Sequence, residues 1–243
     1  MKRTIVLASV LALTMLLAVT GCRRVDLAEE GYLKTETRTV ALEGAEEAQL
    51  DLTMGAGELK LSGADTGSNL VVGEFEYVSE WRPEIEYDVS GDRGVLVARQ
   101  PDVRTWRLGD RKNSWDIEVS QDVPIDLRVT LGAGLSNLDL RDVIVKDLDA
   151  TMGAGDATVD LGGARDRSFS GRVETGAGRI TVRLPKDVGV RITGYQEGVG
   201  EFSADGFEVD GRALVNDAYG VSDVTIELQV VRGIGETVFE LVD

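Results

Sequence analysis

The chain of 243 residues contains no histidine and a single cysteine, Cys22. Without histidine it cannot form a Ser-His-Asp triad, an imidazole general base or a histidine metal site. One cysteine excludes an internal disulfide, a Cys-rich zinc site and a redox pair. The 43 acidic residues outnumber the 26 basic ones, which argues against a nucleic-acid partner, because such proteins concentrate Lys and Arg on one face. We expect neither a metal nor a cofactor.

Long apolar runs are also scarce, and the one that stands out is N-terminal. It extends from Ile5 to Leu17 after the cationic start Met1-Lys2-Arg3. A membrane-spanning helix needs about 20 apolar residues, so this run is too short for a retained anchor. Its layout is that of a secretory signal peptide.

The end of this segment, Leu17-Ala-Val-Thr-Gly-Cys22, resembles the bacterial lipoprotein signal. In that signal the cysteine is linked to diacylglycerol and becomes the mature N-terminus, so the resemblance implies lipidation of Cys22. We predict a signal peptide at 1–21 and a lipid-anchored tether at 22–38, which is charged and lacks an apolar period. The expected location is extracytoplasmic, on the cell membrane or outer membrane. An ordinary secretory signal with a chance cysteine is the alternative.

From Thr39 onward apolar residues alternate with polar ones, as in Leu50, Leu52 and Met54. Alternation of this kind, bounded by Gly, Asp and Ser, is typical of half-buried strands. No sustained helical period occurs outside the signal. The sequence therefore predicts an all-β protein.

Glycine motifs repeat at a nearly constant spacing. Gly-Ala-Gly occurs at 55–57, 132–134, 153–155 and 176–178, with looser Gly-x-Gly copies at 198–200 and 233–235. The last five copies begin 21, 23, 22 and 35 residues apart, and the segment from Gly206 to Tyr219 interrupts the period. Such spacing marks a stack in which each repeat buries its apolar face against its neighbours. The structural turns would be Gly55, Gly57, Gly132, Gly134, Gly153, Gly155, Gly176 and Gly178.

The apolar positions change parity across each motif, as from Leu131 before it to Leu138 after it. The motif must therefore contain a corner, a tight turn or a bulge that absorbs one residue. We predict a β-solenoid-like stack of ~22-residue repeats over 119–243 and an N-terminal β region over 39–118. The alternative is a β-sandwich or roll in which each Gly-Ala-Gly turns an antiparallel hairpin.

Two segments carry a family resemblance. The stretch from Leu50 to Leu59, with Glu74 to Tyr77 and Arg82-Pro83, resembles the N-terminal module of bacterial toast-rack proteins. The stretches 124–134, 151–155, 175–180 and 184–191 are similar to the toast-rack and LiaF-like C-terminal domains of cell-wall-active antibiotic response proteins. The resemblance implies an envelope-facing β-solenoid and supplies no catalytic residue.

Other candidate sites have plainer explanations. The Gly-Ala-Gly loops lack the following helix and the Lys of a phosphate cradle. The segment from Gly153 to Asp160 is similar to a calcium-binding β-roll, but Asp156 becomes Arg179 in the next repeat. Asp139, Asp160 and Arg183 take outward strand positions, where a solvated face is expected.

The aromatic residues Trp81, Trp106, Trp115, Tyr77 and Tyr87 gather in the N-terminal region. They either pack this region over the open end of the solenoid or form a contact surface for a glycan or protein.

These observations predict a non-enzymatic, lipid-anchored cell-envelope protein whose β-solenoid serves adhesion, scaffolding or envelope-stress sensing. Its partners would be the membrane, through the N-terminal lipid, and an envelope protein or glycan of unknown identity. The alternative is a surface carbohydrate-active β-helix, a glycosidase or polysaccharide lyase that uses carboxylates. That alternative requires two carboxylates roughly 5 to 10 Å apart in a groove lined by Trp or Tyr.

The lipid anchor gives the first testable prediction. Cells grown with labelled palmitate should label the wild-type protein and leave Cys22→Ala unlabelled, because only the thiol can take the thioether. An unlabelled wild-type protein would contradict the assignment.

Overall fold

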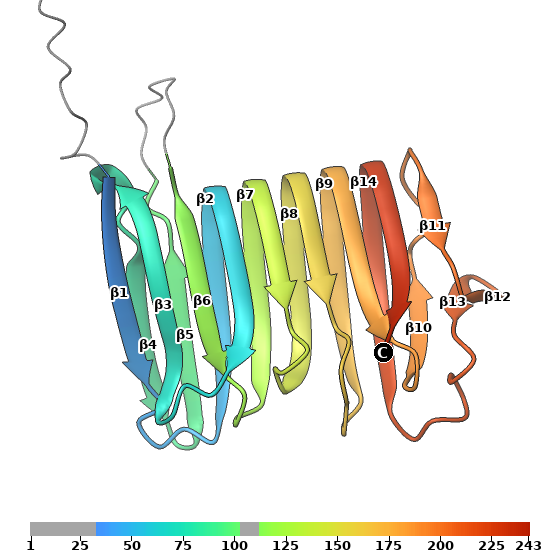
Figure 1. The fold of residues 1–243 in the computed structure, drawn as a ribbon, viewed down its shortest axis with the longest axis horizontal. Coiled ribbons are helices and arrows are strands. Elements are labelled where there is room, and N and C mark those ends of the chain that lie inside the picture. The colour runs from blue at the N-terminus through green and yellow to red at the C-terminus, as the bar shows by residue number, and fades with distance from the viewer. Residues whose placement is uncertain (1–32, 103–111) are drawn as a thin grey trace, which may run out of the picture.

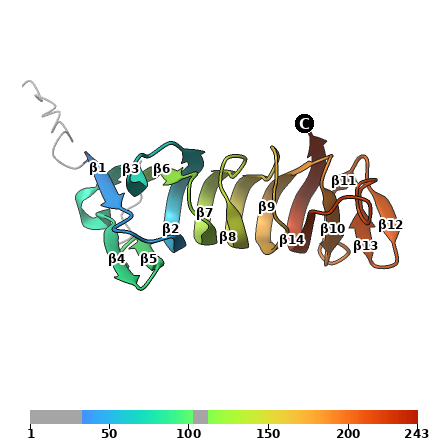
Figure 2. The ribbon, with the colours of Figure 1, turned by 90° about the horizontal axis from the view of Figure 1, so that it is seen from below.

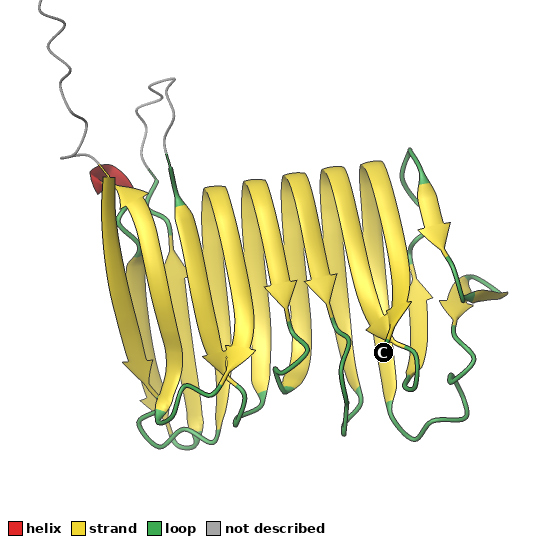
Figure 3. Cartoon of the chain, viewed as in Figure 1, coloured by secondary structure: helices red, strands yellow, loops and turns green. Residues whose placement is uncertain are grey.

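The computed structural model describes residues 33–102 and 112–243, which form fourteen strands and one short 3-10 helix. The strands join into one sheet that folds over onto itself (Figures 1 and 3). The predicted all-β, solenoid-like class is thereby confirmed. The predicted signal peptide, Cys22 and Trp106 lie outside the described residues.

Five long strands form the rungs of the stack. Each climbs the back of the molecule, bends at its Gly-x-Gly and descends the front (Figures 1 and 2). Neighbouring rungs pair in parallel and in register, which rules out a hairpin at each motif. The halves before the bend make the back layer and those after it the front layer. The rungs are β2 (Glu47–Ala64), β7 (Ile125–Asp139), β8 (Val145–Asp160), β9 (Phe169–Pro185) and β14 (Thr225–Val242).

Shorter strands complete both layers. The front layer adds β6 (Ser114–Ser120), β3 (Asn69–Val78) and β1 (Leu33–Ala41) at one end and β11 (Phe202–Ala204) at the other. The back layer adds β5 (Arg93–Arg99) and β4 (Glu84–Ser90) at one end and β10 (Gly189–Thr193), β13 (Ala213–Val215) and β12 (Glu208–Asp210) at the other. The 3-10 helix η2 (Ser79–Trp81) follows β3.

The spatial order of the last rungs differs from their order in the sequence. β14 inserts between β9 and the outer strands β10 and β11, so the Gly233 corner stacks directly on the Gly176 corner. The segment that interrupts the period contributes β12 and β13 to the back layer. The interruption is therefore part of the sheet.

Inward side chains from the two layers meet in one core. Leu127 and Val129 of the back layer and Leu138 and Leu140 of the front layer are each at most 2% exposed, and burial of one such side chain contributes about 1.5–3 kcal/mol. The core is continuous along the stack. The boundary predicted between residues 118 and 119 falls inside β6, so the two predicted units share a strand and a core.

The predicted tether ends earlier than residue 38, because residues 33–38 already belong to β1. This strand has no buried face, so alternation could not reveal it. It is held by antiparallel backbone pairing with β3 from Leu33 to Ala41.

Each corner depends on its two glycines in different ways. The second glycine has positive φ, as in Gly57 (149°) and Gly155 (128°), a region that L side chains avoid. At the first glycine a Cβ would meet the backbone of the preceding rung, since a Cβ on Gly153 would overlap the carbonyl oxygen of Gly132. The absence of both side chains lets the backbones stack.

The first corner has no rung before it, and two side chains take the place of one. Gln100 Oε1 accepts hydrogen bonds from the backbone N–H groups of Gly55 (2.8 Å) and Ala56 (3.1 Å). Asn113 Nδ2 donates to the carbonyl of Ala56 at 2.8 Å. This polar pair satisfies backbone groups that a preceding rung would otherwise bind.

The position of the first glycine gives a matched pair of variants. Gly153→Ala should lower the free energy of unfolding by about 1–3 kcal/mol, because its Cβ would be overpacked against backbone that cannot move freely. Gly55→Ala should change it by less than about 0.5 kcal/mol, because its Cβ would only touch Gln100 Oε1 at 3.5 Å. Urea unfolding measures both; equal losses would contradict the stacking explanation.

The edge strand β1 is fixed to the sheet by Glu36. This carboxylate accepts hydrogen bonds from Arg82 Nη2 (3.0 Å) and from the Tyr77 hydroxyl (2.7 Å). The Arg82 hydrogen bond and then that of Tyr77 lower the pKa of Glu36 to about 2. The ionised carboxylate therefore binds β1 to β3 and to the residue after η2.

This pKa shift predicts a pH-dependent contribution to stability. The folded-state pKa lies below the ordinary value of 4.5, so Glu36 stabilises the fold above that value and loses this effect as the pH falls toward 2. Glu36→Gln should therefore unfold at a lower temperature than wild type at pH 7, and the difference should shrink in acid. A difference that stays constant with pH would contradict the role of the charge.

Candidate functional site

The eight glycines singled out from the sequence lie along the folded edge of the sheet, one pair to each corner. The alanine between the two glycines of each corner is exposed; these are Ala56, Ala133, Ala154 and Ala177. Their chemistry is limited to backbone groups and methyl groups. This edge is a structural feature of the fold.

Asp139 and Asp160 form part of a row on the front layer, but Asp160, expected on a solvated face, is only 9% exposed because neighbouring side chains cover it. Arg183 Nε lies 3.0 Å from Glu240 Oε2, and its Nη1 lies 3.7 Å from Asp160 Oδ2. The Arg141 side chain, hydrogen-bonded to Asp139, lowers the pKa of that carboxyl. Arg183 therefore pairs with acids of the two neighbouring rungs, whereas Asp139 pairs with Arg141 two residues further along the chain.

The segment from Gly153 to Asp160 forms the corner and front half of one rung. Asp156 Oδ1 accepts a hydrogen bond from the backbone N–H of Arg179 at 3.3 Å, and Arg179 Nε lies 2.5 Å from Glu236 Oε2. Within residues 33–102 and 112–243, no cluster of three or more Asp, Glu or Cys side chains is arranged to hold a metal ion.

The aromatic residues predicted to cluster mostly enter the core. Trp115 is fully buried and packs edge-to-face against Phe75, with ring centroids 5.5 Å apart. Tyr77 is buried, and Trp81 and Tyr87 pack against the core while partly exposed. The packing interpretation therefore accounts for these four residues.

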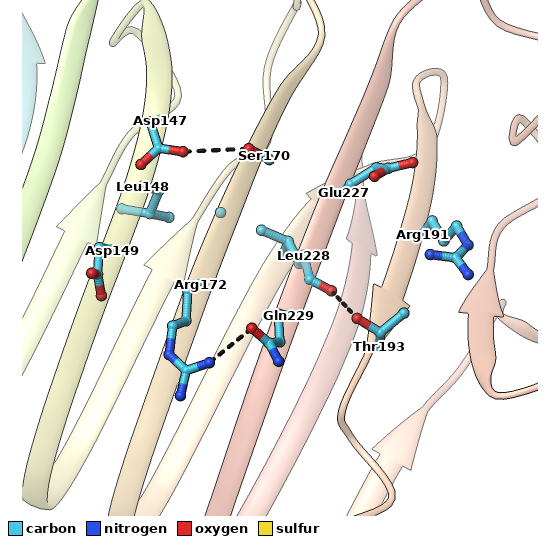
Figure 4. A pocket seen from close by; sticks show the side chains of 11 residues that line it. Asp147, Leu148, Asp149, Ser170, Arg172, Arg191, Thr193, Glu227, Leu228 and Gln229 are labelled. Carbon is cyan, nitrogen blue, oxygen red and sulfur yellow. Dashed lines mark hydrogen bonds between the residues drawn. The ribbon is translucent and has the colours of Figure 1, made fainter.

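A polar hollow of about 350 Å³ lies on the outer face of the back layer (Figure 4). We call it the β9 hollow, because the small residues Ser170 and Gly171 of β9 recess the surface between longer side chains of β8 and β14. It is lined by Asp147, Leu148, Asp149, Ser170, Gly171, Arg172, Arg191, Thr193, Glu227, Leu228 and Gln229.

Hydrogen bonds hold several of these side chains in place, as Figure 4 shows. Arg172 Nη1 donates to Gln229 Oε1 at 2.7 Å, and its Nη2 donates to Glu174 Oε2 at 2.7 Å. Ser170 Oγ donates to Asp147 Oδ1 at 3.3 Å. The floor of the β9 hollow is therefore an ordered polar surface.

A second hollow of about 230 Å³ adjoins the first and shares Arg191, Thr193 and Gln229 with it. We call it the β10 hollow. Its lining residues are Arg191, Thr193, Gly194, Gln196, Glu197, Arg212 and Gln229. It therefore contains two arginines and one carboxylate among neutral groups.

A third hollow, of about 540 Å³, lies among the loops that join the rungs. Arg165 fixes these loops, since it donates to the carbonyls of Leu140 and Val143 at 2.7 Å each. Burial lowers the pKa of Arg165. The Arg165 guanidinium is thus already hydrogen-bonded to loop carbonyls, and that of Arg141, also in this hollow, is hydrogen-bonded to Asp139.

None of these three hollows, which involve only described residues, is lined by Trp or Tyr. The β9 hollow does bring together three carboxylates, Asp147, Asp149 and Glu227. The arrangement expected of a carbohydrate-active groove, with carboxylates beside an aromatic platform, is not found in the described part of the chain.

Sequence reasoning did not single out Arg191 or Arg212. Arg191 closes a stretch that carries the family resemblance, but nothing in the sequence distinguishes it from other strand arginines. What distinguishes these two arginines is that neither forms an ion pair or hydrogen bond with a described residue. Ion pairing depends on which acids lie near an arginine in space, so only the fold reveals this difference.

The family model described as "N-terminal domain of toast_rack, DUF2154" matches residues 29–183. A crystal structure of a candidate cell adhesion protein from Clostridium sporogenes ATCC 15579 has 32% sequence identity and a TM-score of 0.80, covering 86% of this chain and 100% of that chain. No curated protein matches the sequence.

Two candidate adhesins are more distant. Those from Bacteroides fragilis NCTC 9343 and Parabacteroides distasonis ATCC 8503 are each 10% identical, with TM-scores of 0.28 and 0.23. The first alignment covers 84% of this chain and 97% of that chain, and the second covers 86% and 98%. These TM-scores are too low to support an argument about function.

Proposed function

The chain belongs to the toast-rack family, and we propose that it is a non-enzymatic adhesion protein held at the bacterial cell envelope by a lipid on Cys22. Adhesion is preferred over scaffolding or stress sensing because of one observation. The candidate cell adhesion protein from Clostridium sporogenes matches over its whole length at 32% identity.

The outer faces of the stack suit a role in recognition. Register pairing places outward residues of successive rungs in rows, such as the row of Asp51, Arg128, Asp149 and Arg172. Adjacent strands lie about 4.8 Å apart, so the row presents charges at a regular spacing. A surface fixed by the sheet loses little conformational entropy when it binds a partner.

The position of β1 fits attachment through the N-terminus. The described structure begins at Leu33 in β1, which is the outermost strand of the front layer at one end of the stack (Figure 1). Within the described residues, no helix has the length and apolar character to cross a bilayer. Lipid chains contribute about 0.8 kcal/mol of membrane affinity per buried CH₂, so two or more hold a domain durably.

The enzymatic alternative has less support. Its carboxylates would need a sugar-stacking platform, and the hollows described above have none. In addition, Asp139 and Asp160 are each paired with an arginine, Asp139 with Arg141 and Asp160 with Arg183 of the next rung.

The proposal is tested by attachment of whole cells. A strain without the protein should settle less on a surface coated with envelope polysaccharide of the same bacterium, and full-length wild type should restore settling. Cys22→Ala, which lacks the lipid, should not restore it. Equal settling by the deleted and wild-type strains would overturn the adhesive role.

Catalysis is tested with the same polysaccharide. Incubation with the purified full-length protein should release no new reducing ends or unsaturated sugars. Release of either, lost in Asp147→Asn or Asp149→Asn, would replace adhesion with the carbohydrate-active alternative.

A further inference from the structure

Arg191 and Arg212 differ from every other arginine that the structure describes. The others each make an ion pair or a hydrogen bond, as Arg172 does with Gln229 and Arg232 does with the carbonyl of Tyr195. Among the described residues Arg191 and Arg212 make neither, and Arg191 has no hydrogen bond to its neighbours in Figure 4. Both line the β10 hollow.

This coincidence is unusual for so acidic a chain. With 43 acidic residues against 26 basic ones, carboxylates are in excess, yet two guanidinium groups beside one hollow remain without one. Arginine stays charged at every physiological pH, and its planar donors match the two oxygens of a carboxylate. The β10 hollow therefore offers unused donors for an anionic group.

The two arginines come from elements that are fixed relative to each other. Arg191 lies on β10, and Arg212 directly precedes β13, which pairs with β10 in antiparallel fashion. Buried Asn216 reinforces this pairing: its Oδ1 accepts from the N–H of Val190 and its Nδ2 donates to the carbonyl of Val188, both at 2.8 Å. The backbone that carries the two arginines is thus fixed before any ligand binds.

The remaining lining groups restrict the type of anion. Glu197 lies in the same hollow, and Glu227, on the adjoining strand β14, is the register partner of Arg191. These carboxylates would repel a small dianion such as phosphate and need hydroxyl donors. Thr193, Gln196 and Gln229 add neutral polar groups. A sugar that carries one carboxylate beside several hydroxyls meets both requirements.

We propose that the β10 hollow binds a carboxylated sugar unit of an acidic polysaccharide, with Arg191 and Arg212 binding the carboxylate. The neighbouring β9 hollow, which shares three lining residues, would hold the next units of the chain. The β9 hollow, of about 350 Å³, lies near the lower end of the range of small-molecule sites, and the β10 hollow, of about 230 Å³, lies just below it. This inference rests on the proposed adhesive function and names its ligand class.

The net negative charge of the protein does not prevent this binding. At physiological salt the Debye length is about 8 Å, so most of the surface carboxylates are screened from a ligand in the hollow. No aromatic residue lines either hollow, and binding therefore depends on polar contacts that a single pair of substitutions can remove.

The test is calorimetric titration of the purified full-length protein, in detergent micelles, with a hyaluronan tetrasaccharide, which contains glucuronate. The wild type should bind it, and Arg191→Gln/Arg212→Gln should bind at least about tenfold more weakly, since hydrogen bonds to charged groups are the strong ones. The matched control Arg99→Gln/Arg167→Gln removes the same charge elsewhere, from pairs at 3.7 Å, and should bind as wild type does.

Two further ligands test whether the site recognises a sugar carboxylate. The same tetrasaccharide with its carboxylates reduced to alcohols should not bind, and inorganic phosphate should not compete. Unchanged affinity in the Arg191/Arg212 variant, equal binding of the reduced sugar, or effective competition by phosphate would overturn the proposal.

Failure of the sugar-acid site can be distinguished from failure of the proposed adhesive function. If the tetrasaccharide does not bind but the protein still restores settling of cells, the sugar-acid site is wrong and adhesion stands. If the protein does not restore settling, the adhesive role itself is wrong. The unfolding temperature of the Arg191/Arg212 variant should equal that of wild type, because neither side chain forms a hydrogen bond or ion pair with a described residue.

Discussion

The close stacking of backbones at the Gly-x-Gly corners is the constraint on which the rest of the structure depends. A carbonyl oxygen of one rung occupies the space where a Cβ of the next would stand, as Gly132 does beneath Gly153. Parallel pairing can therefore continue in register around the bend. That register places apolar side chains of both layers in one core and arranges the outward charges in rows.

At each end of such a stack, the backbone groups of the corner have no neighbouring rung to bind and need another hydrogen-bond partner. At the first corner Gln100 and Asn113 bind the backbone groups that a preceding rung would have bound. At the other end Arg232 donates to the carbonyls of Tyr195 and Glu201, on either side of the Gly198–Gly200 corner, and lies over the ring of Phe202. Both ends use polar side chains on backbone, because the repeat itself cannot supply a partner there.

Local pattern predicted much of this fold and little of the candidate site. Alternating residues such as Leu127, Val129 and Leu131 revealed the strands, since burial on one face imposes a period of two. The β9 and β10 hollows depend on which rungs become neighbours. β14 inserts between β9 and β10, so Gln229 meets Arg172 across 57 residues of sequence, and no local period carries that information.

The sequence by itself determined the strand periodicity, the corners and the absence of imidazole and disulfide chemistry, because each follows from residue type and spacing. Tertiary structure alone decided the order of the last rungs, the assignment of residues 33–38 to β1 and the lack of an ion pair between Arg191 or Arg212 and a described acid. These features depend on which backbones pair and which charges come within about 4 Å of one another. Such distances are set only when the whole sheet has folded over.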